Sequence, residues 1–246
     1  MTTITEPRVE LIAHTTLACD GRSPAIEGHM SLDPDAGDAQ QLVEFAGRSC
    51  YQSFHKPNPA TARNKDYIAR TLHSQNHWSI AEHATATFYI TGVSRALTHE
   101  LIRHRHLSYS QLSQRFVDES EANIVIPPAA RSSIATVPQL DGFRGARKIY
   151  LSAALEGWGE EALSNYEDLV EAFTTVGLPR KQAREAARAV LPNMVETRIV
   201  VTGNLRAWHE VIERRTAPDA DAEFQEVAGM IRDELQRLAP EVFPEP

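Results

Sequence analysis

Hydrophobic residues recur at helical spacing over much of this chain. The longest series takes steps of three and four residues and stops before Gly177 and Pro179, which predicts one apolar stripe along a long helix. Its members are Leu155, Trp158, Ala162, Tyr166, Leu169, Phe173 and Val176. Shorter patterns of the same kind predict further helices over 42–51, 64–75, 94–103, 180–191, 205–214 and 224–238.

Strand patterns are shorter and fewer. Alternation over 9–13 predicts an edge strand, and the stretch 85–91, rich in Thr and aromatic residues, predicts another that Gly92 ends. Residues 124–126 and 199–202 predict two more. Because helices and strands do not alternate regularly, we expect a single mixed α+β domain rather than a doubly wound sheet.

Composition narrows the class of protein. The 246 residues carry a formal net charge of −8, from 25 Lys and Arg against 33 Asp and Glu, which argues against a general nucleic-acid binder. No uncharged apolar stretch is long enough to span a bilayer, and the first residues lack the pattern of a secretion signal. Cys19 and Cys50 are too few for a disulfide framework, and we expect Cys50 to be a small buried hydrophobe. The chain is therefore expected to be a soluble cytoplasmic protein.

Positive charge in this acidic chain is concentrated in three segments. The first, 95–115, contains four arginines and three histidines with one acid, Glu100, and the others are 180–188 and 206–215. Arginine binds phosphate through two parallel hydrogen bonds, and hydroxyl groups complete such a site, so the segments predict a ligand with several phosphates. A solvated basic face is the alternative for each. In the second segment, the basic residues spaced to share one helix face are Lys181, Arg184 and Arg188.

Other kinds of site have weaker support. Residues 99–103 resemble the helix motif of zinc proteases, but an arginine at the fifth position cannot bind zinc. His73, His77 and His83 leave a three-histidine metal site open as an alternative, although nearby arginines would repel a cation. The chain has no glycine-rich phosphate loop, and nothing near Cys50 in the sequence would lower its pKa for attack as a nucleophile.

The segment Arg103-His104-Arg105, followed after seven residues by Ser113 and then Arg115, resembles the signature of the flavin-dependent thymidylate synthases (the ThyX family). The resemblance continues in order along the chain, over roughly residues 8–243. The further segments that carry it are 44–48, Cys50-Tyr51, Lys56-Pro57-Asn58-Pro59, Glu82-His83, 188–193, 196–198 and 202–204, leading to Arg206 and Arg215.

This resemblance implies a fold, an assembly and an activity. The fold is a single α+β domain over 1–246 with a mostly antiparallel sheet and long helices, assembled as a homotetramer whose active sites lie where subunits meet. Family members bind FAD and convert dUMP to dTMP, with 5,10-methylenetetrahydrofolate as carbon donor and NADPH-reduced FAD as hydride source. They use no cysteine nucleophile. The expected partners are these small molecules, without a resident metal, a nucleic acid polymer or a membrane.

The resemblance also implies roles for individual residues. Arg215 is the expected catalytic residue, because a guanidinium beside N3 of the uracil stabilises its anion without losing a proton. The residues expected to contact FAD are Ser79, Arg103, His104, Arg105, Gln111, Asn204 and Arg206. Those expected to contact dUMP are Glu100, Arg103, Gln111, Leu112, Ser113, Gln114, Arg115, Arg188 and Arg215, with Arg95 as a further candidate and Tyr51 as a candidate for the cofactor pocket.

Two places depart from the family pattern. Six residues after Asn204 the family commonly has His or Asn in contact with flavin, whereas this chain has Glu210, with His209 before it. After Arg215, residues 216–219 read Thr-Ala-Pro-Asp, where the family often runs to Ser and His. These departures favour an alternative, a regulatory homologue that binds dUMP and FAD without turnover. We expect activity, because the arginines themselves are retained.

Overall fold

A four-stranded antiparallel sheet forms the centre of the protein. The structure is a computed structural model that describes residues 5–29, 31–55, 58–137 and 147–245. In spatial order, the strands are β1 (Arg8–His14), β2 (Thr85–Ser94), β6 (Glu196–Asn204) and β3 (Leu107–Gln111). All the pairings in this sheet are antiparallel, so the predicted α+β fold is confirmed.

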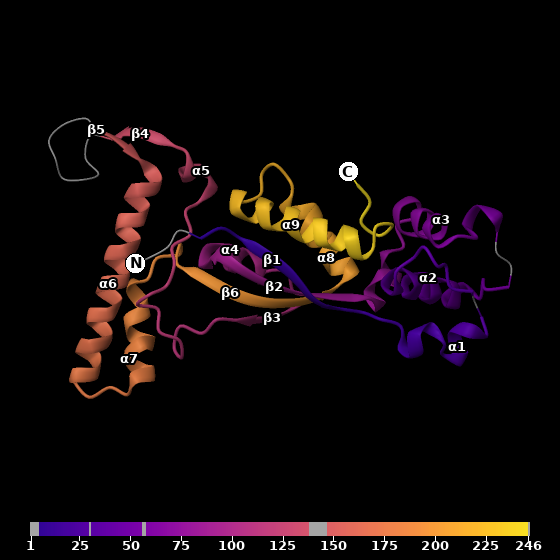
Figure 1. Cartoon of the computed structure of the whole chain (residues 1–246), viewed down its shortest axis with the longest axis horizontal. Helices are drawn as coiled ribbons and strands as arrows, with labels where there is room; N and C mark the ends of the chain where they lie inside the picture. The colour runs from indigo at the N-terminus through magenta and orange to yellow at the C-terminus, as the bar shows by residue number, and fades with distance from the viewer. Residues whose placement is uncertain (1–4, 30, 56–57, 138–146, 246) are drawn as a thin grey trace.

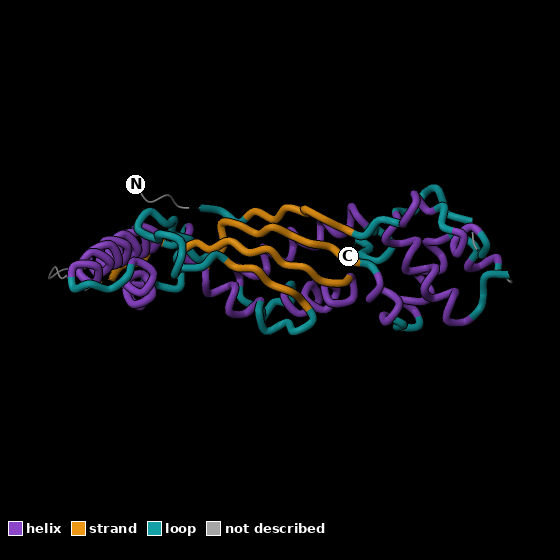
Figure 2. The backbone as a smooth tube through the Cα atoms, turned by 90° about the horizontal axis from the view of Figure 1, so that it is seen from below, coloured by secondary structure: helices purple, strands orange, loops and turns teal. Residues whose placement is uncertain are grey.

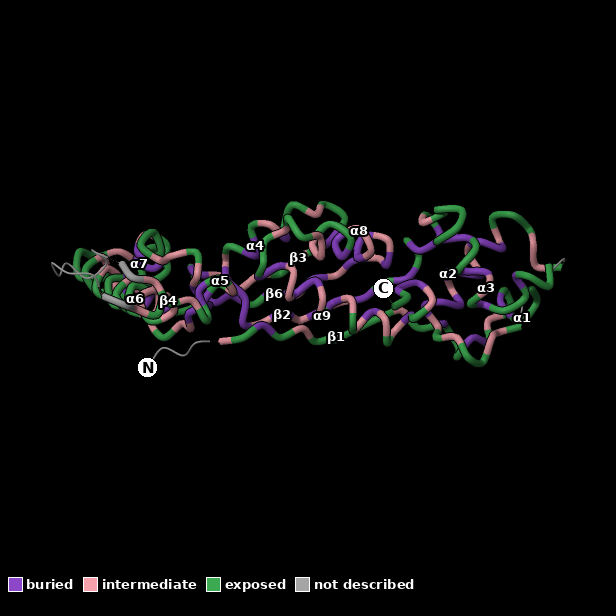
Figure 3. Tube along the Cα trace, turned by 90° about the horizontal axis from the view of Figure 1, so that it is seen from above, coloured by how far each residue is buried: buried purple, intermediate pink, exposed green. Residues whose placement is uncertain are grey.

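One face of the sheet is covered by helices, and no described helix covers the other. Figure 3 shows the helices lying over the sheet, and Figure 2 shows the strands uncovered when seen from the opposite side. Alternate strand residues such as Phe88, Ile90 and Val201 are fully buried against Trp208 and Phe224 of the covering helices. The covering helices are α4 (Arg95–Leu101), α8 (Leu205–Arg215) and α9 (Ala222–Leu238).

Helical units lie at the two ends of the sheet (Figure 1). At one end are α1 (Pro24–Glu27), α2 (Asp38–Tyr51) and α3 (Asn64–Ile68), which continues as a π-helical turn (Ala69–Ser74), with 3-10 helices at Ala18–Gly21, Pro59–Thr61 and Trp78–His83. At the other end are α5 (Pro128–Arg131), the hairpin of β4 (Ile134–Val137) and β5 (Arg147–Tyr150), α6 (Leu151–Thr175), α7 (Arg180–Ala187) and a 3-10 turn (Arg188–Val190). No helix within the described ranges is long and apolar enough to cross a bilayer.

Three local predictions were wrong, and one strand was missed. Gly92 does not end its strand: with φ of +68° it forms a bulge, and β2 continues to Ser94. Residues 124–126 form only one bridge, between Ile124 and Val195, rather than a strand. Strand β3 was not predicted, although Leu107 and Tyr109 alternate with Ser108 and Ser110. Cys50 is exposed on α2, not buried.

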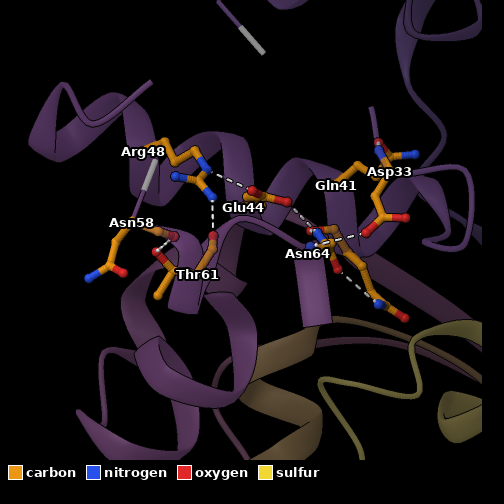
Figure 4. Close-up of polar contacts among 8 residues, drawn as sticks. Asp33, Gln41, Glu44, Arg48, Asn58, Thr61 and Asn64 are labelled. Carbon is orange, nitrogen blue, oxygen red and sulfur yellow. Dashed lines mark hydrogen bonds and ion pairs between the residues drawn. The ribbon is translucent and has the colours of Figure 1, made fainter. Parts of the chain in front are cut away.

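A buried ion pair joins α2 to α3 and to the turn before it (Figure 4). The Arg48 Nε donates to Glu44 Oε1 at 2.6 Å, and Arg48 Nη2 donates to the carbonyl of Thr61 at 2.6 Å. The other carboxylate oxygen of Glu44 accepts from Asn64 Nδ2 at 2.8 Å, and the Arg48 guanidinium lies 4.5 Å from the ring centre of Tyr67. This network fixes the unit against which the helix Trp78–His83 packs. Lys56 and Pro57 of the family-like segment 56–59 lie outside the described residues.

Substitution Arg48→Ala is expected to lower the free energy of unfolding by about 3–5 kcal/mol, because it leaves the Glu44 carboxylate buried without its cation. The matched control is Arg63→Ala, whose ion pair with Asp35 is exposed, so its loss is expected to cost less than about 1 kcal/mol. Urea denaturation at one protein concentration measures both. Equal, small losses in the two variants would contradict the importance of the buried pair.

Candidate active site

An arginine-rich cavity of about 550 Å³ opens between the end of α4, the start of β3 and helix α8. It is lined by residues that the sequence assigned to cofactor and nucleotide, together with five that it did not assign. The former are Glu100, Arg103, His104, Arg105 and Arg215, and the latter are His106, Leu107, Ala207, Glu210 and Arg214.

Arg215 ends α8 and points into this cavity in a fixed orientation. Its Nε donates to His104 Nε2 at 3.1 Å, and its Nη1 donates to Glu100 Oε2 at 3.0 Å. The guanidinium carbon also lies 4.8 Å from the ring centre of Phe224. Only 18% of the side chain is exposed, so these contacts hold the cation in a partly desolvated place where its charge acts strongly.

The imidazole of His104 is held in its neutral form. Burial, with the charges of Arg215 and Arg214, lowers the pKa of His104 to about 4. Because Nε2 accepts the hydrogen bond from Arg215, the ring proton is on Nδ1. His104 therefore orients the guanidinium without adding a second positive charge.

Tyr109 of β3 supports the turn that carries these residues. Its hydroxyl lies 2.7 Å from the carbonyl oxygen of His104 and 2.8 Å from that of Leu101. Burial raises the pKa of Tyr109 to about 12, so the hydroxyl stays protonated as a donor. The strand missed in the sequence thus anchors the motif that the sequence identified.

Two further cavities adjoin the first, and Glu210 lines all three. The larger, of about 690 Å³, contains Ser79 and a Trp78–His209 stack whose ring centres are 3.6 Å apart. The smaller, of about 150 Å³, contains Asn204, which also caps α8 through a hydrogen bond from the Ala207 N–H. Both are lined by Arg206, whose guanidinium lies 2.6 Å from Glu82 and 3.6 Å from Glu210.

A second group of predicted residues lies at the far end of β3. Gln111 Nε2 donates to the hydroxyls of Thr98 and Thr197, at 3.0 and 3.2 Å. The following turn contains Gln114 and Arg115. It is closed by the carbonyl of Ser113, which accepts hydrogen bonds from the backbone N–H groups of Phe116 and Val117. Leu112 N donates to the carbonyl of Arg198. The predicted residues in this turn are Leu112, Ser113, Gln114 and Arg115.

Within one chain, the structure does not bring the two groups into one cavity. Strand β3 separates them by roughly 15 Å, since each strand residue adds about 3.3 Å. Arg184 also differs from the expectation of a shared basic face with Lys181 and Arg188. It is buried, donates to the carbonyl of Phe116 and pairs with Asp118, whereas Arg188 is exposed.

The described residues contain no group of three or more His, Cys, Asp or Glu side chains arranged to hold a metal ion, so the three-histidine alternative has no site there. Sequence reasoning did not foresee the Trp78–His209 stack. Its two rings come from segments 131 positions apart, and no local pattern signals such a contact.

Comparison with known proteins identifies the family. A family model described as "Thymidylate synthase complementing protein" matches residues 34–241. The flavin-dependent thymidylate synthase of Mycobacteroides abscessus is 48% identical over 244 residues, which is 99% of this chain and 91% of that protein. That of Corynebacterium efficiens is 44% identical over 245 residues, with the same shares.

A solved structure shares the fold. The crystal structure of Thymidylate Synthase X (ThyX) from Helicobacter pylori with FAD and dUMP matches 98% of this chain and 100% of that chain, with a TM-score of 0.63 at 20% sequence identity. The family match and the near-full-length identities show that this chain belongs to the flavin-dependent thymidylate synthases.

Proposed function

We propose that the protein is an FAD-dependent methyltransferase of the cytoplasm that converts dUMP to dTMP, with 5,10-methylenetetrahydrofolate as carbon donor and NADPH as reductant. The observation that carries this proposal is Arg215, held in an arginine-rich cavity by Glu100 and a neutral His104. A fixed cation of this kind favours ionisation at N3 of a uracil placed beside it. The relatives named above support the choice of substrate.

The donor set of the adjoining cavities fits FAD. Arg206, Ser79 and Asn204 provide a cation, a hydroxyl and an amide, which suit a pyrophosphate and a sugar. The stacked pair Trp78–His209 adds a flat aromatic surface. When bound, FAD supplies the hydride that completes the methyl group. To bind the phosphate of FAD, the Arg206 guanidinium must give up part of its ion pair with Glu82.

We further propose that the chain folds as one domain over 1–246 and assembles as a homotetramer with its sites between subunits. The face of the sheet that no described helix covers supports this assembly (Figure 2), and so do exposed apolar side chains at the α6 end, such as Trp158 (43%) and Val176 (73%). Within one chain, β3 keeps the turn around Ser113 apart from Arg215. In the assembly, the Ser113 turn of one chain would lie close to Arg215 of a second chain. This gives one nucleotide contacts at both its base and its phosphate.

Purified protein is expected to bind FAD with a flavin absorption spectrum and to release tritium from 5-tritiated dUMP when methylenetetrahydrofolate and NADPH are present. A protein that binds neither FAD nor dUMP would contradict the proposal. Tight dUMP binding without dTMP formation, even with chemically reduced flavin, would instead support the regulatory alternative.

Substitution Arg215→Ala is expected to lower turnover at least about 100-fold, because it removes the cation that stabilises the uracil anion. FAD absorbance and the oligomeric state by light scattering are expected to be unchanged. The control is Arg237→Ala, which removes an exposed arginine of α9 paired with Glu234. Turnover equal to that of the control would exclude the assigned role.

Substitution Ser113→Ala is expected to weaken dUMP binding by about 1–3 kcal/mol, because one hydrogen bond to a charged phosphate is lost. Titration calorimetry measures the affinity, and Ser31→Ala, an exposed serine in the segment before α2, is the control. An affinity for dUMP that matches the control would show that Ser113 does not bind the phosphate.

A further inference from the structure

Unpaired buried polar groups are concentrated behind the turn that follows β3. Within the described part of the chain, six buried side-chain atoms have no hydrogen-bond partner, and five of them belong to this region. Leaving polar atoms buried and unpaired is costly, so their concentration in one place points to a function. The five are Arg95 Nη1, Gln114 Nε2, Glu119 Oε1, the Tyr166 hydroxyl oxygen and Arg184 Nε.

These groups converge from four parts of the chain. Arg95 begins α4, Glu119 lies in the segment after β3, Tyr166 is in the middle of α6, and Arg184 is on α7. Only 2% of Glu119 is exposed, and Tyr166 is fully buried. Burial lowers the pKa of Arg95, and the charge of Glu119 opposes this shift while the charge of Arg188 adds to it.

Glu119 differs from the other carboxylates near it. Asp118, beside it in the chain, is paired with Arg184, and Glu196 on β6 accepts hydrogen bonds from Gly92 N and Asn123 Nδ2. The Glu119 carboxyl has no such partner among the described residues, and burial raises its pKa to about 7. The charged and titratable groups that face it are Arg95 from α4, Asp118 from its own segment, Glu196 and Arg198 from β6, and Tyr166 from α6.

We propose that Glu119 is a positioning residue behind a phosphomonoester site of Arg95 and Arg188, and that its carboxylate takes up a fraction of a proton from solvent, up to about half, when the phosphate dianion binds. The inference rests on the proposed function, because it concerns the phosphate of the nucleotide. A dianion at Arg95 adds negative charge near Glu119 and competes for the cation that stabilises the carboxylate. Protonation of Oε1 relieves that repulsion and leaves Arg95 directed at the ligand.

The sign of the linkage follows from this competition. Below about pH 7 Glu119 is already protonated, so the affinity for the dianion is greatest there. As the pH rises through the pKa of free Glu119, binding requires proton uptake, and affinity falls. The phosphate itself has the opposite effect: its second pKa is about 6, so binding of the dianion near that pH releases a proton. Net proton uptake above pH 7 is therefore the signature of Glu119.

Titration calorimetry with dUMP, in two buffers of different ionisation enthalpy between about pH 6.5 and 8.5, tests the proposal. Wild-type protein should take up protons above pH 7 and lose about three- to tenfold in affinity across the range, which corresponds to a shift of up to one pKa unit. Glu119→Gln should show neither effect and should bind about as tightly at high pH as wild type does at low pH. Glu121→Gln, an exposed neighbour, is the matched control and should behave as wild type.

Two results would overturn the proposal. One is an unchanged pH profile and proton uptake in Glu119→Gln, and the other is a loss of affinity by the same factor at every pH, as for a purely structural residue. If Glu119→Gln does not fold, wild-type protein decides alone, because the absence of proton uptake above pH 7 excludes the role.

Inorganic phosphate as a second probe separates this inference from the proposed function. If dUMP fails to bind while phosphate shows the response that depends on Glu119, the proposed function is wrong and the inference holds. If dUMP binds without that response, the inference alone is wrong. If neither probe binds, both are wrong.

Discussion

Strand β6 pairs with β2 on one side and with β3 on the other, and the candidate site depends on this double pairing. Its last residue, Asn204, caps α8 and thereby aims the helix so that Arg215 reaches His104. The same pairing places β3, whose Tyr109 holds the carbonyl of His104. Because a register shift of one residue would turn every strand side chain to the other face, the register itself determines which groups meet in the cavity.

Arginines placed close together in the cavity repel one another, and the site limits this repulsion without neutralising all of their charge. Arg215 has one carboxylate partner, Glu100, and two neutral acceptors, His104 and the backbone carbonyl of Glu100. A charged His104 would repel both neighbouring arginines, and burial among them keeps its pKa low. The cavity thus keeps an excess of positive charge, as an anionic substrate requires.

Local patterns predicted the helices and the charged segments well, since amphipathic spacing and caps act within a few residues. Ser94, expected to begin a helix, does cap α4 through a hydrogen bond from Leu97 N. Such local patterns did not predict contacts between segments that are distant in the sequence. Nothing in the sequence signals that Glu119 is buried close to Arg95, or that β3 pairs with β6, because sheet pairing and burial depend on the whole fold. The family motif named the candidate residues of the site but not their separation within one chain.

The carboxylates around the arginines differ in how they can respond to an anionic ligand. Glu82 and Glu210 are 46% and 39% exposed beside Arg206, so water screens their ion pairs and the side chains can turn away at small cost. Glu119 is 2% exposed, so water does not solvate its charge. A buried carboxylate that cannot move can respond only by taking up a proton. If it stayed ionised beside a bound phosphate, its charge would remain buried without solvation, at a large cost in free energy. Glu82 and Glu210 can therefore respond to an anionic ligand by moving away from the arginine, whereas Glu119 responds by taking up a proton.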